Sequence, residues 1–246
     1  MSRFAVIFDM DGVIFDTERL ALQLWTAAAE ECGIPEVVEQ YHRFIGVTVV
    51  RTREILRELY GPDFSVADFE AAIRRHFERR YAREGLPVKP GAEEILRFLR
   101  QAGIPTALAS STLTATVTRE LRDAGFLEYF TVVVGGDQAT RSKPNPDIFL
   151  RAAELLGMEP ASCWVIEDSF NGIRAAHAAG MHPLMVPDLL QPTEEIRNLA
   201  ERVFPSLREA QAFLSTGDGS LCSQRTQRPV PCALGAPAFS RQLLGG

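Results

Sequence analysis

The sequence has no long apolar run, few cysteines and fewer basic than acidic residues. No run approaches the roughly 18 apolar residues that span a bilayer, and the apolar segment 4–8 is too short for the core of a signal peptide. No Cys-x-x-Cys pair occurs, so neither a disulfide framework nor a zinc site is expected. The four cysteines are Cys32, Cys163, Cys222 and Cys232. The reducing cytoplasm is therefore the expected location.

Acidic residues outnumber basic ones, with 32 Asp and Glu against 26 Lys and Arg, and the net charge is -6. This balance disfavours binding to nucleic acid or to an anionic membrane surface, so we expect neither partner. With 246 residues, of which 46% are hydrophobic and 24% charged, the chain has an ordinary globular composition. Its length suggests one or two domains with a real core.

Five short apolar runs have the length of strands, and each ends abruptly in polar residues. They cover residues 4–8, 105–109, 131–134, 163–166 and 183–186. Helical spacing of apolar residues follows in most cases, clearest at 95–102, 148–156 and 171–179. Strands that alternate with helices predict an α/β fold with a doubly wound parallel sheet.

Residues 18–84 differ from the rest, because their apolar residues recur only at helical spacing. We interpret this stretch as an all-helical insertion after the first strand, and Gly85 and Pro87 mark the return to the α/β core. Segments 1–17 and 85–214 would then form the core. The tail 215–246 carries five Gly and three Pro without any period, which predicts a disordered or loosely attached extension.

Polar residues follow four of the predicted strands at the point where each strand ends. They are Asp9 and Asp11, then Ser110 and Ser111, then Lys143, and finally Glu167 and Asp168. In an open parallel sheet these ends form the ligand-binding edge, so the side chains should converge. Carboxylates that meet repel one another, and a hard cation such as Mg²⁺ relieves the repulsion. A cation beside a lysine and hydroxyl groups suits a phosphate.

The first of these clusters also offers a nucleophile. Asp9 stands at a rigid strand tip, where its carboxylate can attack phosphorus and form an aspartyl phosphate. Asp11, two residues later in a turn, can protonate a leaving oxygen and later deprotonate water. Gly12 permits a tight turn and a close approach of backbone N–H groups to an anion.

Four sequence motifs stand in this order along the chain. They are DMDGVIFDTE at 9–18, ALASS at 107–111, KPNPDIF at 143–149, and VIEDS at 165–169 followed by Asn171-Gly172. Together they resemble the four motifs of the haloacid dehalogenase (HAD) superfamily, the third in the form found in β-phosphoglucomutase-like members. The resemblance covers residues 1 to about 214 and implies a Rossmann-like core with an inserted all-helical cap.

The resemblance also implies roles for individual residues. Asp9 would be the nucleophile and Asp11 the general acid and base. Ser110 would bind the phosphoryl oxygens, and Lys143 would neutralise charge on the nucleophile and the phosphate.

The resemblance further implies a Mg²⁺ site and a substrate pocket. The ion would be held by the Asp9 side chain, the Asp11 backbone carbonyl and Asp168, with Glu167 near or in its shell. Candidate substrate-binding residues are Gly12, Ser111, Glu18 and, in the cap loop 44–48, Gly46.

Several of these residues also have simpler interpretations. Ser110 could cap the following helix, and Lys143 could be a surface lysine. Glu167 could accept hydrogen bonds without binding a metal. Asp16 and Thr17 could form the hinge and the start of the first cap helix. Four histidines match none of the motifs and are expected to be structural, namely His42, His76, His177 and His182.

The choice between a phosphatase and a mutase depends on positions in the expected cap. β-Phosphoglucomutases typically carry a histidine where this chain has Ala21, and an arginine where it has Val49. Arg51 or Arg53 could substitute for that arginine. These departures favour hydrolysis.

We therefore expect a cytoplasmic, monomeric, Mg²⁺-dependent phosphatase of small phosphorylated metabolites. The alternatives are β-phosphoglucomutase and, in a different class, a catalytically silent binding module.

Overall fold

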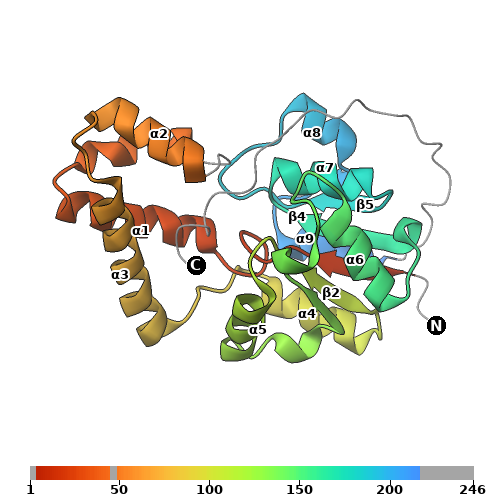
Figure 1. Ribbon diagram of the computed structural model, residues 1–246. Helices are drawn as coiled ribbons and strands as arrows, with labels where there is room; N and C mark the ends of the chain where they lie inside the picture. The colour runs from red at the N-terminus through yellow and green to blue at the C-terminus, as the bar shows by residue number, and fades with distance from the viewer. Residues whose placement is uncertain (1–3, 45–48, 217–246) are drawn as a thin grey trace.

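Six parallel strands form one sheet, in the order β3-β2-β1-β4-β5-β6, in the computed structural model, which describes residues 4–44 and 49–216 (Figure 1). The strands are β1 (Ala5–Phe8), β2 (Thr106–Ala109), β3 (Val132–Val134), β4 (Cys163–Glu167), β5 (His182–Met185) and β6 (Arg202–Val203). The predicted α/β fold is thereby confirmed. Strand β6 was not predicted, because two residues are too few to show a pattern.

The first strand lies in the middle of the sheet. Phe8 is aligned with Leu108 on β2 and with Ile166 on β4. The carboxyl ends of these three strands therefore lie side by side, and the residues that follow them meet at one edge. This register decides where the polar clusters of the sequence come together.

Alternate residues of β1 face opposite layers of helices, as the period of two in a strand requires. Ala5 and Ile7 pack in the core under α6 and α7, whereas Val6 and Phe8 pack with α4, α5 and α9. These core helices are α4 (Ala92–Gln101), α5 (Thr114–Asp123), α6 (Asp147–Leu156), α7 (Phe170–Ala178), α8 (Glu194–Leu199) and α9 (Leu207–Ser215). Short 3₁₀ turns, η2 (Leu127–Tyr129), η3 (Gly136–Gln138) and η4 (Pro160–Ser162), complete the core connections.

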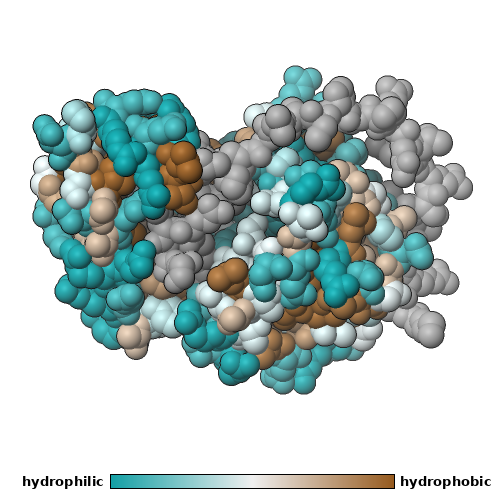
Figure 2. Space-filling view, viewed as in Figure 1, coloured by the Kyte–Doolittle hydropathy of each residue, from teal (hydrophilic) through white to brown (hydrophobic). Residues whose placement is uncertain are grey.

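Between β1 and α4 the described elements are all helical, and they form the lobe on the left of Figure 1. They are α1 (Thr17–Glu31), η1 (Pro35–Arg43), α2 (Val49–Tyr60) and α3 (Val66–Glu84). The lobe has its own aromatic centre, because the Trp25 ring lies 5.4 Å from Tyr41, 4.7 Å from Phe44 and 5.1 Å from Phe69. Hydrophilic residues cover most of its surface in Figure 2. The domain limits 18–84, 1–17 and 85–214 stay a prediction.

Two chain segments join the helical lobe to the sheet, and they pair with each other. The Asp16 N–H donates to the Pro87 carbonyl at 2.8 Å, and the Lys89 N–H donates to the Ile14 carbonyl at 2.9 Å. Phe15 and Val88 form an antiparallel bridge between these bonds. We call residues 14–16 and 87–89 the connecting ribbon.

Helix α9 is the last element that the structure describes, and it ends at Ser215. Most of the tail predicted at 215–246, with Cys222 and Cys232, lies outside the described residues. None of the helices within the described ranges has the length and apolar character needed to cross a membrane.

Candidate active site

The polar residues that follow β1, β2 and β4 meet at the carboxyl edge of the sheet. Asp9, Ser110, Lys143 and Glu167 are all buried. They are four of the eight buried polar or charged residues in the described part of the chain, so this edge holds half of them. Burial of this kind costs free energy unless each group finds a partner.

Lys143 reaches this edge from the loop before α6 and bridges two of the carboxylates. Its Nζ lies 2.6 Å from Asp9 Oδ1 and 2.8 Å from Glu167 Oε1, and it also donates to the Ala109 carbonyl at 3.3 Å. Burial alone would lower the pKa of the ammonium, but the two carboxylates raise it above its ordinary value. The interpretation of Lys143 as a surface lysine is therefore wrong.

Glu167 is fully buried at the end of β4, and two donors hold its carboxylate. Besides Lys143 Nζ on Oε1, the Ser169 N–H donates to Oε2 at 2.7 Å. Gly172 on α7 leaves it room, because a Cβ there would lie 1.6 Å from Oε1. These bonds show Glu167 as a hydrogen-bond acceptor, and its contact with a metal stays a prediction.

The Asp168 carboxylate lies against Gly12 in the turn after β1, as the Glu167 carboxylate lies against Gly172. A Cβ on Gly12 would lie 2.1 Å from Asp168 Oδ2, and the φ of Gly12 is +75°, so both space and backbone conformation require glycine there. The Gly12 N–H donates to the Phe15 carbonyl at 2.9 Å and to Thr17 Oγ1 at 3.2 Å. The turn itself thus uses the N–H that the sequence analysis assigned to an anion, and anion binding by Gly12 stays a prediction.

We call the carboxylates of Asp9, Asp11, Glu167 and Asp168 the carboxylate edge. Their charges are close enough to act on one another. Burial raises the pKa of Asp9 to about 7 despite the opposing effect of Lys143, and the charges of Glu167 and Asp11 add to the rise. Burial also raises the pKa of Asp168 well above its ordinary value, and the nearby charges of Glu167 and Asp9 contribute. Burial and the neighbouring charges thus favour the protonated forms of Asp9 and Asp168.

The residues present fit a divalent cation with oxygen ligands. One carboxylate oxygen from each of Asp9, Glu167 and Asp168 lies within 4.8 Å of the others. Asp11 is not in this group of side chains, and the sequence analysis assigned it a backbone ligand instead. A hard cation would offset the repulsion among these carboxylates, and Mg²⁺ prefers such ligands.

Ser110 is buried at the end of β2, where its N–H donates to the Val134 carbonyl at 3.0 Å. Its hydroxyl accepts from the Thr112 N–H at 3.1 Å. Helix α5 starts only at Thr114 and has no side-chain cap, so the alternative that Ser110 caps it is wrong. Ser111 is exposed beside it.

Of the two lobe residues that are predicted to bind substrate, the structure describes Glu18 but not Gly46. Glu18 stands in the first turn of α1, and its negative charge, after burial in each case, helps to raise the pKa values of both Asp168 and Tyr41. Gly46 lies outside the described residues. Ala21 is buried on α1.

The two arginines considered as substitutes for a mutase arginine are engaged elsewhere. Arg51 Nη1 lies 3.0 Å from Glu54 and 2.8 Å from Glu58. Arg53 binds Glu70 through two bonds of 2.7 and 2.9 Å.

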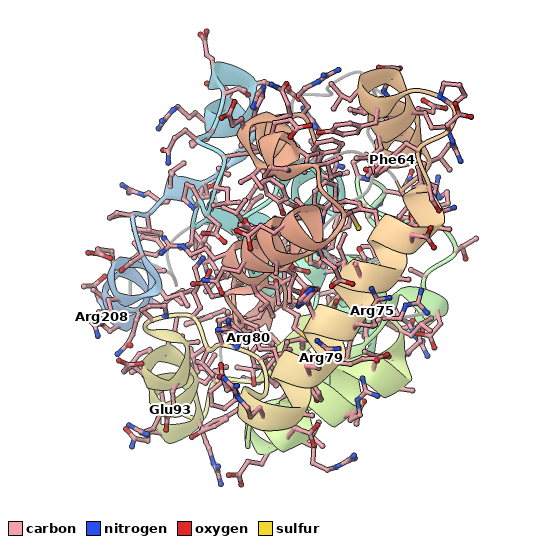
Figure 3. The ribbon with its side chains drawn as sticks, turned by 90° about the vertical axis from the view of Figure 1, so that its left-hand side faces the viewer. Phe64, Arg75, Arg79, Arg80, Glu93 and Arg208 are labelled. Carbon is pink, nitrogen blue, oxygen red and sulfur yellow. The ribbon has the colours of Figure 1, made fainter. Side chains whose placement is uncertain are left out.

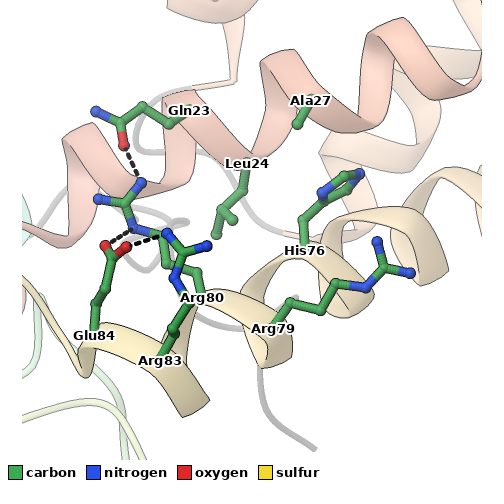
Figure 4. Close-up of a pocket in the computed structure, with 8 residues that line it drawn as sticks. All are labelled: Gln23, Leu24, Ala27, His76, Arg79, Arg80, Arg83 and Glu84. Carbon is green, nitrogen blue, oxygen red and sulfur yellow. Dashed lines mark hydrogen bonds and ion pairs between the residues drawn. The ribbon is translucent and has the colours of Figure 1, made fainter.

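A groove of about 230 Å³ between α1 and α3 contains none of the predicted site residues (Figure 4). Its cations are largely paired within the lobe, since Arg80 Nη1 donates to Gln23 at 2.9 Å and Arg83 pairs with Glu84. Arg79 also lines the groove, and Figure 3 shows it on α3 together with Arg75, which is not part of the lining. The groove offers neither a nucleophile nor a carboxylate cluster, so we do not assign the chemistry to it.

Comparisons with known proteins identify the family of this chain. The family model described as haloacid dehalogenase-like hydrolase matches residues 5–180. A phosphorylated carbohydrates phosphatase of Thermotoga maritima is 37% identical over 177 residues, which cover 72% of this chain and 82% of that protein. A Drosophila melanogaster protein named "Probable pseudouridine-5'-phosphatase" is 33% identical over 211 residues, 82% of this chain and 89% of that protein.

A solved structure from Thermotoga maritima, described as a "putative beta-phosphoglucomutase", has a similar fold. It superimposes with a TM-score of 0.75 at 32% identity and covers 87% of this chain and 99% of that one. The family model spans most of the chain and includes every residue of the carboxylate edge. This chain belongs to the haloacid dehalogenase-like hydrolases.

Proposed function

We propose that this chain is a Mg²⁺-dependent phosphatase that hydrolyses small phosphorylated metabolites, sugar phosphates or similar compounds, through a phosphoryl group carried on Asp9. The observation that carries the proposal is the position of Asp9, which stands at the tip of the central strand with Lys143 Nζ 2.6 Å from its Oδ1. Relatives named as phosphatases of phosphorylated carbohydrates and of pseudouridine 5'-phosphate support the substrate class.

The reaction needs two transfers at phosphorus. An Asp9 carboxylate oxygen forms a bond to phosphorus while the bond from phosphorus to the ester oxygen breaks, and Asp11 donates a proton to that oxygen. Asp11 then takes a proton from water, whose oxygen attacks the phosphoaspartate. The bond between phosphorus and Asp9 breaks, and phosphate and the free Asp9 carboxylate result.

Fixed side chains compensate the negative charge of the transferred phosphoryl group. Lys143 presents its ammonium to the nucleophile, and the Ser110 hydroxyl can donate to a phosphoryl oxygen while it accepts from Thr112. Asp9, Asp168 and the Asp11 carbonyl would hold Mg²⁺, with Glu167 near or in its shell. The bound ion supplies neutralisation of carboxylate and phosphoryl charge.

The alternative of a β-phosphoglucomutase finds less support in the helical lobe. Ala21 cannot act as an acid or base, and both Arg51 and Arg53 are bound to glutamates. The alternative of a silent binding module conflicts with the site, since every catalytic position has a residue able to do its chemistry.

The test is phosphate release with Mg²⁺ over a panel of β-glucose 1-phosphate, hexose 6-phosphates, fructose 1-phosphate, pentose phosphates and pseudouridine 5'-phosphate. Asp9→Asn is the blank, and Asp63→Asn, at an exposed loop position, is the matched control. We expect free phosphate from wild type and Asp63→Asn alone. Glucose 6-phosphate from β-glucose 1-phosphate without free phosphate would establish the mutase, and no turnover at all would favour the silent module.

A further inference from the structure

Lys89 forms a second cluster of charges, outside the carboxylate edge, whose side chains are largely but not fully buried. Its Nζ lies 2.7 Å from Asp188 Oδ1 and 3.4 Å from Asp16 Oδ1. The side chains of Lys89 and Asp188 are only 12% and 2% exposed. A buried pair of this kind is expensive to break, because removal of the cation leaves a carboxylate without compensation.

The chain contains only two lysines, Lys89 and Lys143, although it has 26 basic residues of these two types. Each of the two lies between two carboxylates, Lys143 in a buried place and Lys89 with a side chain that is 12% exposed. An ammonium is a compact charge with three donors, whereas a guanidinium is a planar fork. Both positions therefore place a compact cation between two carboxylates.

The position of the Lys89 cluster links three parts of the molecule. Asp16 and Lys89 stand on the two segments of the connecting ribbon, which carries the helical lobe. Asp188 belongs to the core, three residues beyond the end of β5. Lys89 therefore ties both segments of the ribbon to the carboxyl edge of the sheet.

Asp188 depends on Lys89 for the compensation of its charge. Lys89 Nζ lies 2.7 Å from Asp188 Oδ1, whereas Arg19 Nε lies 3.9 Å from the same oxygen. The Asp188 Oδ2 is buried and, within the ranges that the structure describes, has no hydrogen-bond partner. The ammonium of Lys89 is thus the near counter-charge for this acid.

We propose that Lys89 is a positioning residue for the reaction, which sets the place of the helical lobe over the carboxylate edge by holding the connecting ribbon against Asp188. The expected effect on KM rests on the proposed function, whereas the statement that Lys89 holds the connecting ribbon does not. Lys89 does not touch the reacting atoms. Its loss should therefore weaken binding of the part of the substrate that the lobe contacts, and affect the chemical step less.

Arg19 provides a matched control, because it is a cation beside the same two acids. Its Nε lies 3.7 Å from Asp16 Oδ1 and 3.9 Å from Asp188 Oδ1, but its side chain is 66% exposed. Exposed ion pairs of this geometry contribute little. Arg19→Met should therefore leave the ribbon and the KM nearly unchanged, to within about twofold.

The kinetic experiment measures kcat and KM at saturating Mg²⁺ for Lys89→Met, Asp188→Asn and the double variant. Lys89→Met should raise KM about tenfold and change kcat less than about threefold. The double variant should be less impaired than the product of the two single effects, because Asp188→Asn removes the charge that lost its partner. An unchanged KM in Lys89→Met, or effects that simply multiply, would overturn the proposal.

A second measurement does not depend on activity. Hydrogen exchange of the Asp16 and Lys89 amides, which close the ribbon, should be about tenfold faster in Lys89→Met and unchanged in Arg19→Met. Equal exchange in wild type and Lys89→Met would overturn the proposal even if the kinetics agreed. If wild type hydrolyses nothing on the panel, the proposed function fails, and the exchange result alone still decides whether Lys89 holds the ribbon.

Discussion

The Gly172→Ala substitution tests the close contact between Gly172 and the Glu167 carboxylate. This contact leaves room for Glu167 to accept from Lys143 and from the Ser169 N–H. Inside an ordinary helix this change stabilises a protein by about 0.5–1 kcal/mol, because alanine restricts the unfolded chain. At position 172 the added methyl group would lie 1.6 Å from Glu167 Oε1, so the carboxylate has to move. Movement breaks its bonds from Lys143 Nζ at 2.8 Å and from the Ser169 N–H at 2.7 Å.

The two lost bonds outweigh the gain in helix propensity. A hydrogen bond to a charged group contributes about 1.5–3 kcal/mol, so the loss of both costs about 3–6 kcal/mol. Subtraction of the helix gain leaves a destabilisation of about 2–5 kcal/mol. In a chain of this length that corresponds to a fall in Tm of roughly 5–20 °C.

Thermal unfolding without Mg²⁺ measures this effect, and a Glu167→Ala background provides the control. There the side chain that collides with the new methyl group is absent, so Gly172→Ala should be neutral or raise the stability by up to about 1 kcal/mol. A higher Tm for Gly172→Ala in the wild-type background would refute the packing of Glu167 against α7. An equal fall in both backgrounds would refute the assigned cause.

Three further predictions concern the charges of the site. Lys143→Ala should lower kcat by roughly 10²–10³, because it removes a fixed cation from the transferred phosphoryl group, and a loss below tenfold in steady-state kinetics would place Lys143 outside the reaction. Asp168→Asn should weaken Mg²⁺ binding measured by calorimetry by at least about tenfold while the circular dichroism spectrum stays native, and unchanged affinity would exclude it as a ligand. Burial raises the pKa of Asp9 to about 7, so folding favours its protonated form and the metal-free protein should lose stability as the pH rises through about 7. Saturating Mg²⁺ should remove this loss, since the ion binds the ionised carboxylate, and a Tm that depends on pH equally with and without Mg²⁺ would contradict the assignment.

The central strands could be predicted from the sequence because their apolar runs are short, continuous and followed at once by polar residues. Burial on both faces explains this pattern, since both layers of helices cover β1. Helix α5 was harder to recognise, because it is rich in threonine and has only Val117 and Leu121 as large buried apolar residues. Strand β6 has two residues and carries no pattern at all.

The convergence of Asp9, Ser110, Lys143 and Glu167 was expected on the condition that their strands are neighbours, since parallel strands bring their carboxyl ends to one edge. Pairings between distant segments could not be predicted in the same way. Nothing local marks Lys89 as the partner of Asp188, because the pair depends on how the connecting ribbon lies against the loop after β5. The pairing of Arg53 with Glu70 likewise depends on how α2 packs against α3.

The most direct test of the central claim is to trap the phosphoryl group on the enzyme. Wild type, Asp9→Asn and Asp63→Asn are mixed with a radiolabelled substrate from the panel and Mg²⁺, quenched in acid during turnover, and mapped by peptide. The account predicts hydroxylamine-sensitive label on the peptide that contains Asp9 in wild type and Asp63→Asn, and none in Asp9→Asn. Label on another residue, or phosphate release by Asp9→Asn at the wild-type rate, would contradict it.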